Sequence, residues 1–229
     1  MRLTLPLALG LAAALTAAPA SARPDRRGAQ AEVLFGGTGC VSSRAKCQAE
    51  GDIAGKTGPL VGFGATAGFR PLRVLMIGAA YNLGFFTPDY RLGGADVYRR
   101  AYQHGVYGIV RAILPLWRFD FGLEIGPGWS RQVFTADGGE LRRDVADLGL
   151  VRVDREYSQG FALKTAPVID FFLTKRFFIG AKIDLLFNFH REVCYEIEGR
   201  SQRACYRADE ANQASVHQVI GGLHLGAAF

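Results

Sequence analysis

Residues 118–129 read Arg-Phe-Asp-Phe-Gly-Leu-Glu-Ile-Gly-Pro-Gly-Trp, with an apolar side chain at every second position from Phe119 to Trp129. The positions between them hold Asp120, Glu124 and three glycines. A helix would repeat its apolar face every three or four residues, whereas a strand alternates strictly between two faces. The stretch therefore predicts a β-strand with one large apolar face and one small or polar face.

The same alternation recurs along the chain. It is strong at 61–69, 75–85 and 177–190, and weaker at 32–38, 105–114, 159–172 and 216–229. No run beyond the first 22 residues approaches the ~20 apolar residues that a membrane-spanning helix needs. The sequence predicts an all-β fold of about eight strands.

The connections between these strands alternate in length. Tight turns are expected at Pro71-Leu72, Pro115-Leu116 and Thr174-Lys175. The other four connections are long and polar, at 39–57, 87–104, 133–157 and 192–215. Short turns at one end and long loops at the other predict an antiparallel up-and-down meander. Partial alternation at 151–154 predicts that strands continue into the third long loop.

The first residues have the parts of a secretory signal peptide. Arg2 precedes an apolar run, and Ala20-Ser21-Ala22 forms a small-residue cleavage site. We therefore expect residues 1–22 to be a signal peptide, 23–30 a short polar leader, and 31–229 the barrel.

Composition excludes several classes of protein. The 229 residues are 49% hydrophobic, and the 29 glycines follow no triplet, so the chain is neither disordered nor collagen-like. The formal charge of +6 comes from 27 basic and 21 acidic residues spread along the chain. So small and diffuse an excess does not indicate a nucleic-acid partner.

The four cysteines form two groups, Cys40 with Cys47 and Cys194 with Cys205. Neither group has the CxxC spacing with histidines that a zinc site requires. An exported chain meets an oxidising environment, so disulfides are expected. We favour the two local pairs, and a cross-link between the first and last long loops is the competing arrangement, because those loops adjoin when a barrel closes.

Side-chain volume predicts which face points outward. The apolar face carries nine phenylalanines, too much volume for the narrow lumen of an eight-stranded barrel: Phe63, Phe69, Phe85, Phe119, Phe121, Phe171, Phe177, Phe187 and Phe189. The other face, rich in glycine and alanine, suits that lumen. An outward apolar band on an exported protein predicts an outer-membrane barrel, in which every backbone polar group is paired.

The pattern resembles the small eight-stranded outer-membrane proteins of Gram-negative bacteria, the group that includes OmpX, OmpW and the membrane domain of OmpA. The last strand carries the likeness most clearly, with Leu223, Leu225 and the terminal Phe229 in alternation. The resemblance implies an eight-stranded antiparallel transmembrane barrel in the outer membrane. It also implies that the barrel-assembly machinery reads the aromatic terminus and that the protein is a monomer among outer-membrane lipids. Arginines on the expected outward loops make lipopolysaccharide phosphates a candidate partner, with solvated loop charge as the alternative: Arg99, Arg100, Arg142, Arg143, Arg191, Arg200, Arg203 and Arg207.

With the large face outward, eight charged residues point into the lumen: Arg111, Arg118, Lys164, Lys182, Asp120, Glu124, Asp170 and Asp184. Counting back from the expected turns pairs Arg111 with Asp120 and Lys164 with Asp184. Because buried charges are tolerated only when paired, this arrangement favours a closed, salt-bridged lumen over an ion-conducting path.

Other functions are less well supported by the residues. Ser215 and His217 share a strand face, but the lipid A deacylases that this pair resembles have the histidine before the serine. We expect no catalytic residue, cofactor or metal. Passage of small hydrophobic solutes, as in OmpW-like proteins, would use the inward apolar residues Met76, Ile109, Leu186 and Ile220. The leading hypothesis is a structural or surface-interaction role, with solute passage second and lipid modification third.

Overall fold

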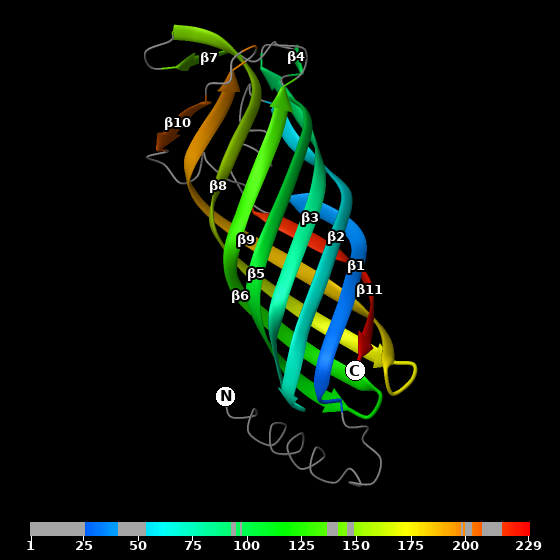
Figure 1. Cartoon of the computed structure of the whole chain (residues 1–229). Helices are drawn as coiled ribbons and strands as arrows, with labels where there is room; N and C mark the ends of the chain where they lie inside the picture. Colours follow the sequence, from blue (N-terminus) through cyan, green and yellow to red (C-terminus); the bar gives the residue numbers. More distant parts are fainter. Residues whose placement is uncertain are drawn as a thin grey trace, which may run out of the picture.

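The computed structural model describes residues 26–40, 54–92, 95–96, 98–136, 142–145, 149–197, 199, 203–207 and 217–229. Eight long strands form a tilted barrel (Figure 1): β1 (Gly28–Cys40), β2 (Ala54–Leu72), β3 (Leu75–Leu92), β5 (Tyr98–Leu116), β6 (Phe119–Ala136), β8 (Gly149–Phe172), β9 (Phe177–Ile197) and β11 (Gln218–Ala228). Three short strands lie at the long-loop end: β4 (Ala95–Asp96), β7 (Arg142–Val145) and β10 (Arg203–Arg207).

The ring closes between the first and last strands. Phe35 of β1 pairs with Leu223 of β11 on one side and with Phe63 of β2 on the other. Antiparallel pairing continues through every neighbour until β9 meets β11. The eight-stranded antiparallel up-and-down fold is thereby confirmed. Closure leaves no sheet edge, so the backbone polar groups of the ring are paired without water.

The strand face with the large apolar side chains points outward and the other face points into the lumen, as side-chain volume predicts. Outward phenylalanines are exposed, including Phe69 at 57% and Phe177 at 58%. Inward residues of the same strands are buried, such as Met76 at 0% and Lys164 at 1%. Among the described residues, no helix is long and apolar enough to cross a membrane.

Two belts of aromatic side chains lie on the exterior, one around the ring and a shorter one on β6 and β8. The belt nearer the long loops takes residues from seven long strands and from the position just before β11, many of them in ring contact: Phe35, Phe63, Phe85, Tyr102, His104, Trp129, Phe161, Phe187, Phe189 and His217. The other contains Phe119, Phe121 and Phe171. Phe161 and Phe171 are ten residues apart on β8. At ~3.3 Å per residue and a ~40° tilt this corresponds to about 25 Å, the height of the apolar band of membrane barrels.

Inward glycines make room for the few large side chains of the lumen. A Cβ at Gly226 would lie 2.0 Å from Phe178 Cζ, and one at Gly128 would lie 2.6 Å from Tyr107 Cδ1. Each large residue therefore occupies the space that a small one leaves. The lumen is filled by side chains, as expected for a barrel of eight strands.

The tight turns differ from the sequence prediction by up to two residues. The β2–β3 turn is Arg73-Val74 and the β5–β6 turn is Trp117-Arg118, each two residues later than expected. The β8–β9 connection spans residues 173–176. Pro71 and Pro115, taken as turn residues, are instead paired or extended at strand ends.

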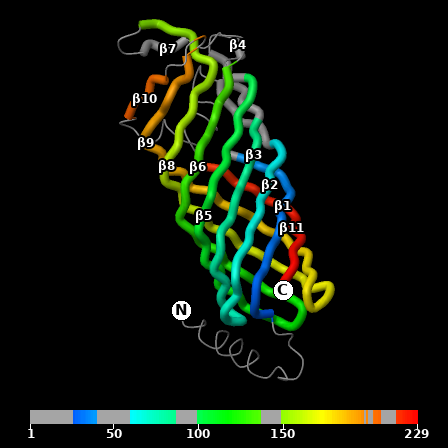
Figure 2. The backbone as a smooth tube through the Cα atoms, viewed as in Figure 1, coloured from blue at the N-terminus to red at the C-terminus, as the bar shows by residue number. Residues whose placement is uncertain are grey.

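The amino-terminal boundary also differs from the prediction. β1 begins at Gly28, so the strand includes the last three residues assigned to the leader. The signal peptide at 1–22 lies outside the described residues. Both β1 and β11 meet the tight-turn end (Figure 2), where Phe229 N donates to Ala29 O at 2.8 Å.

Of the long strands, β8 extends furthest beyond the upper aromatic belt. β8 begins at Gly149, twelve residues before Phe161, and β9 continues to Ile197. Figure 2 shows β8 reaching the top of the molecule with β7 beside it, and β10 lying beside β9 at the same end. The alternation at 151–154 thus belongs to β8, as predicted.

Candidate functional site

Arg111 is the centre of the charged layer in the lumen. Its Nη1 and Nη2 lie 3.0 and 2.5 Å from the two carboxylate oxygens of Glu32. Its Nε and Nη2 also donate to Glu124 Oε2, at 3.1 and 2.8 Å. Such forked pairing is the strongest geometry open to a guanidinium. One side chain from β5 thereby links β1 to β6.

The two lysines complete this layer. Lys182 Nζ lies 2.8 Å from Glu32 Oε1 and 3.2 Å from Glu124 Oε2. Lys164 Nζ lies 3.0 Å from Asp184 Oδ1 and 3.2 Å from Glu124 Oε1. Asn82 accepts from Lys164 Nζ at 3.0 Å and donates to Asp184 at 2.5 Å. Every charge here has at least one opposite partner, as burial requires.

Asp120 closes the tight-turn end with two arginines. Its Oδ2 lies 2.6 Å from Arg70 Nη1, and its Oδ1 pairs with Arg26 Nη1. Arg26 Nη2 donates to Trp117 O at 2.6 Å, and its guanidinium lies 3.8 Å from the centre of the Phe172 ring. Arg26, two residues before β1, thus occupies the mouth of the lumen and is only 5% exposed.

A histidine joins the layer from the last strand. His224 Nε2 lies 2.6 Å from Asp170 Oδ1, and Arg111 Nη1 lies 3.8 Å from Asp170 Oδ2. Glu32, Asp170 and His224 have ligand atoms within 4.8 Å of one another. Glu32 is already held by Arg111 and Lys182, so a metal ion would face two fixed positive charges. The donor set fits an ion-pair network better than a metal site.

Glu156, a buried carboxylate that pairs in register with Phe134, lies nearer the long loops and apart from the charged layer. Within the charged layer and at the tight-turn mouth, five cations face five carboxylates, all buried: Arg26, Arg70, Arg111, Lys164 and Lys182 against Glu32, Asp120, Glu124, Asp170 and Asp184. Sequence reasoning found seven of these ten and missed Arg26, Arg70 and Glu32.

Two predicted features of the network are wrong. Arg118 lies exposed on the β5–β6 turn, with its guanidinium 5.7 Å from the Trp117 ring centre. Arg111 pairs in register with Glu124, and Asp120 with Pro115, because the turn falls two residues later than expected. The predicted contact between Lys164 and Asp184 does form, diagonally, since Lys164 pairs in register with Leu186.

A second, uncharged polar layer lies nearer the long loops. Gln103 and Asn188 exchange hydrogen bonds of 3.2 and 3.0 Å, and Ser130 Oγ donates to Asn188 Oδ1 at 2.6 Å. His190 lies between two serines, 2.8 Å from Ser130 Oγ and 2.9 Å from Ser158 Oγ. Sequence reasoning did not find this layer, although its members have inward parity on their strands.

Apolar residues separate and cover the two polar layers. Met76, Ile109, Leu186 and Ile220, considered above as a solute pocket, pack with Tyr107 in one buried cluster. A further cluster of Phe86, Ala101, Phe134 and Val153 lies closer to the long loops. The inward apolar residues are therefore packing, which leaves the lumen filled along the described strands.

Comparison with known proteins yields no family model and no curated protein that matches the chain. A major outer membrane protein from Thermus thermophilus matches in structure with a TM-score of 0.57 at 10% identity, over 87% of this chain and 99% of that one. Neisserial surface protein A matches with a TM-score of 0.51 at 10% identity, over 88% and 96%. The chain has the fold of the small outer-membrane β-barrels. At this identity the likeness extends to the fold alone.

The contacts of His190 with Ser130 and Ser158 are enclosed within the barrel lumen. Ser130 and His190 are 0% exposed and Ser158 is 2% exposed, so a substrate has no route to them. His217, singled out with Ser215 as a possible catalytic residue, lies in the outer aromatic belt, 5.6 Å from the Phe187 ring centre. Its Nδ1 accepts from the backbone N of Asn188 at 3.1 Å. Ser215 lies outside the described residues.

The other residues predicted from the sequence are the four cysteines and the apolar residues of the last strand. Cys194 of β9 and Cys205 of β10 form a disulfide and are register partners. Cys47 and the side chain of Cys40 lie outside the described residues, so their pairing stays a prediction. Leu223, Leu225 and Phe229 are exposed at 64%, 57% and 72%. Their reading by the assembly machinery also stays a prediction.

Proposed function

We propose that this protein is an outer-membrane β-barrel of a Gram-negative bacterium, with a closed lumen and a structural or surface-interaction role. Export through the signal peptide 1–22, assembly through the Phe229 terminus and a monomeric state in the membrane belong to the proposal. The two aromatic belts, about 25 Å apart by strand length, support membrane insertion.

The balanced ion pairs carry the closed-lumen part of the proposal. A conducting pore keeps water and unpaired polar groups along its axis, whereas here five cations are matched by five carboxylates that are almost without exposure. Filling of this kind holds eight strands together and leaves no path for solutes.

The extension of β8 and β9 supports a role in surface interaction. Twelve residues of β8 before the aromatic belt correspond to roughly 30 Å at a tilt of ~40°, in addition to the part of the strand that spans the apolar band. The disulfide ties β10 to this extension. Arg191, Arg203 and Arg207 are exposed on it, placed to contact lipopolysaccharide phosphates.

Solute uptake into liposomes tests this proposal against transport. Vesicles with the folded protein should swell no faster than empty vesicles in solutes of graded size and polarity. Selective entry of one class of solute would refute the closed lumen and favour passage of small molecules.

A further inference from the structure

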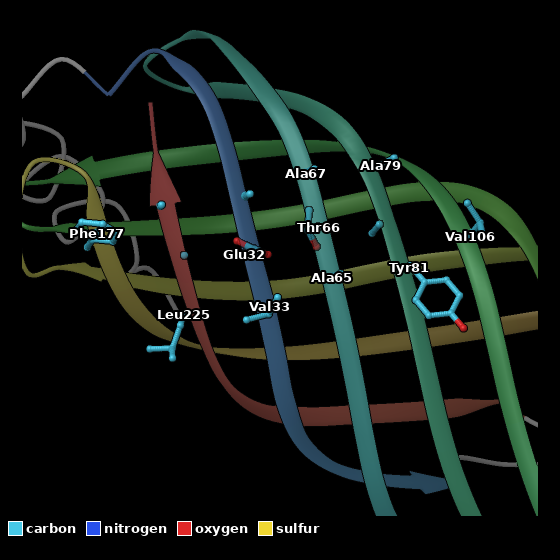
Figure 3. A pocket seen from close by; sticks show the side chains of 14 residues that line it. Glu32, Val33, Ala65, Thr66, Ala67, Ala79, Tyr81, Val106, Phe177 and Leu225 are labelled. Atoms are coloured by element: carbon cyan, nitrogen blue, oxygen red, sulfur yellow. The ribbon is translucent and has the colours of Figure 1, made fainter.

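An apolar groove of about 610 Å³ crosses the outside of β11, β1, β2 and β3 (Figure 3). Its floor is a row of alanines paired in register across the four strands: Ala227, Ala31, Ala67 and Ala79. The adjacent row supplies one wall, in which Ala65 of β2 lies among bulkier residues: Leu225, Val33, Tyr81 and Val106. The lipid-facing surface is therefore hollowed below the level of its neighbours here.

The stagger of the strands makes this groove climb the barrel. It begins at Phe177, the first residue of β9, which pairs with Ala227. It runs toward Gly108, eight residues above the end of β5, where an added Cβ would meet nothing within 4 Å. Five strand spacings of ~4.8 Å give a length of about 24 Å. With strands tilted by ~40°, this slanted length rises by about 15 Å, the depth of one leaflet of a ~30 Å hydrocarbon core.

Positive charge lies at the lower end of the groove. Lys175 and Arg176 immediately precede Phe177 and are exposed, and no carboxylate among the described residues pairs with them. Arg176 O accepts from Ala228 N at 2.7 Å, and Phe177 N donates to Thr174 Oγ1 at 2.9 Å, which fixes the loop beside the groove. The tight turns also carry Arg73 and Arg118 and contain no acidic residue.

We propose that this groove binds one anionic phospholipid of the leaflet at the tight-turn end. An acyl chain lies along the alanine floor, and the headgroup phosphate contacts Lys175 and Arg176, whose long side chains reach the membrane surface. An anionic headgroup is preferred because a zwitterionic one brings its own cation to the same site. The proposal rests on the membrane insertion proposed above. A second copy fits less well, since a two-fold interface would place hollow against hollow.

The test measures lipid association with the folded protein in bilayers, using chain-spin-labelled phosphatidylglycerol and phosphatidylcholine. The unmodified barrel should immobilise phosphatidylglycerol preferentially. Ala67→Phe fills the floor and should lower its association by about threefold, a modest loss because the chain leaves the groove for other lipid rather than for water. Ala181→Phe, at an exposed position of β9 outside the groove, is the matched control and should have no effect.

A second pair of changes tests the headgroup. Lys175→Gln with Arg176→Gln should remove the preference for phosphatidylglycerol and leave phosphatidylcholine unchanged. Protease resistance of the reconstituted barrel checks insertion separately, and its failure would refute the proposed function rather than the lipid site. Equal lipid association by the Ala67 and Ala181 variants in inserted barrels would overturn the lipid site. So would disulfide-linked dimers of Ala67→Cys, which would assign the groove to a second copy.

Discussion

Breaking the Lys164–Asp184 pair should destabilise the barrel less than a change that leaves a buried charge with no opposite charge beside it. Loss of one partner of a buried pair costs roughly 3–5 kcal/mol. Here Lys164→Met leaves Asp184 with Lys182 Nζ at 3.9 Å, and Asp184→Asn leaves Lys164 with Glu124 at 3.2 Å. Each single change should therefore cost about 3 kcal/mol, near the lower limit.

The double variant separates pairing from simple proximity. If the two residues stabilise each other, removing both should cost about 3 kcal/mol rather than 6, a coupling at the upper end of those measured for contacting residues. Guanidinium unfolding of the folded barrel in detergent, followed by tryptophan fluorescence, measures these free energies. Arg111 and Asp120, which share no contact, form the control cycle and should be additive within ~0.5 kcal/mol. Additivity for Lys164 and Asp184, or coupling between Arg111 and Asp120, would refute the assigned network.

Three further changes test separate parts of the structure. Arg26→Gln should lower the free energy of unfolding by roughly 1–3 kcal/mol, which is less than the cost of breaking a buried ion pair, because Asp120 still pairs with Arg70. The control is Lys175→Gln at an exposed position, which should change the free energy of unfolding by less than ~0.5 kcal/mol in the same denaturation assay. Gly226→Ala forces a Cβ toward Phe178 and should cost ~1–3 kcal/mol, part of which Phe178→Leu should restore; an unchanged denaturation midpoint would contradict the packed lumen. Cys205→Ser should raise hydrogen exchange in β10 and leave the denaturation midpoint of the barrel unchanged, so a lower midpoint would show that the hairpin supports the ring.

The strands and their facing follow from sequence because period and volume are local properties. Phe119 to Trp129 alternate without interruption, and their bulk cannot fit inside eight strands. Turn placement has no such local basis here. Trp117 adopts a positive φ of 52°, a conformation that glycine or asparagine would normally mark. Because position 117 holds neither glycine nor asparagine, Pro115 is the strongest turn former in this part of the sequence. A turn placed at Pro115, two residues too early, predicts Asp120 instead of Glu124 as the partner of Arg111.

Some of the missed lumen residues lie just beyond the ends of the expected strands, whereas Glu32 lies at the first position of the 32–38 strand. Arg70 has inward parity one position past the expected end of the 61–69 strand, and Gln103 lies just before the 105–114 strand. Arg26 belongs to no strand, so alternation has no information about it. Its burial depends on Asp120 and Trp117, which are more than 90 residues away.

Conductance of the purified, folded protein in planar lipid bilayers tests the closed lumen most directly. The balanced charges and packed apolar clusters predict a bilayer current indistinguishable from that of protein-free membranes over the physiological range of voltage. Stable stepwise currents from the unmodified protein, abolished by heat unfolding before insertion, would show an open path through the barrel and contradict the account.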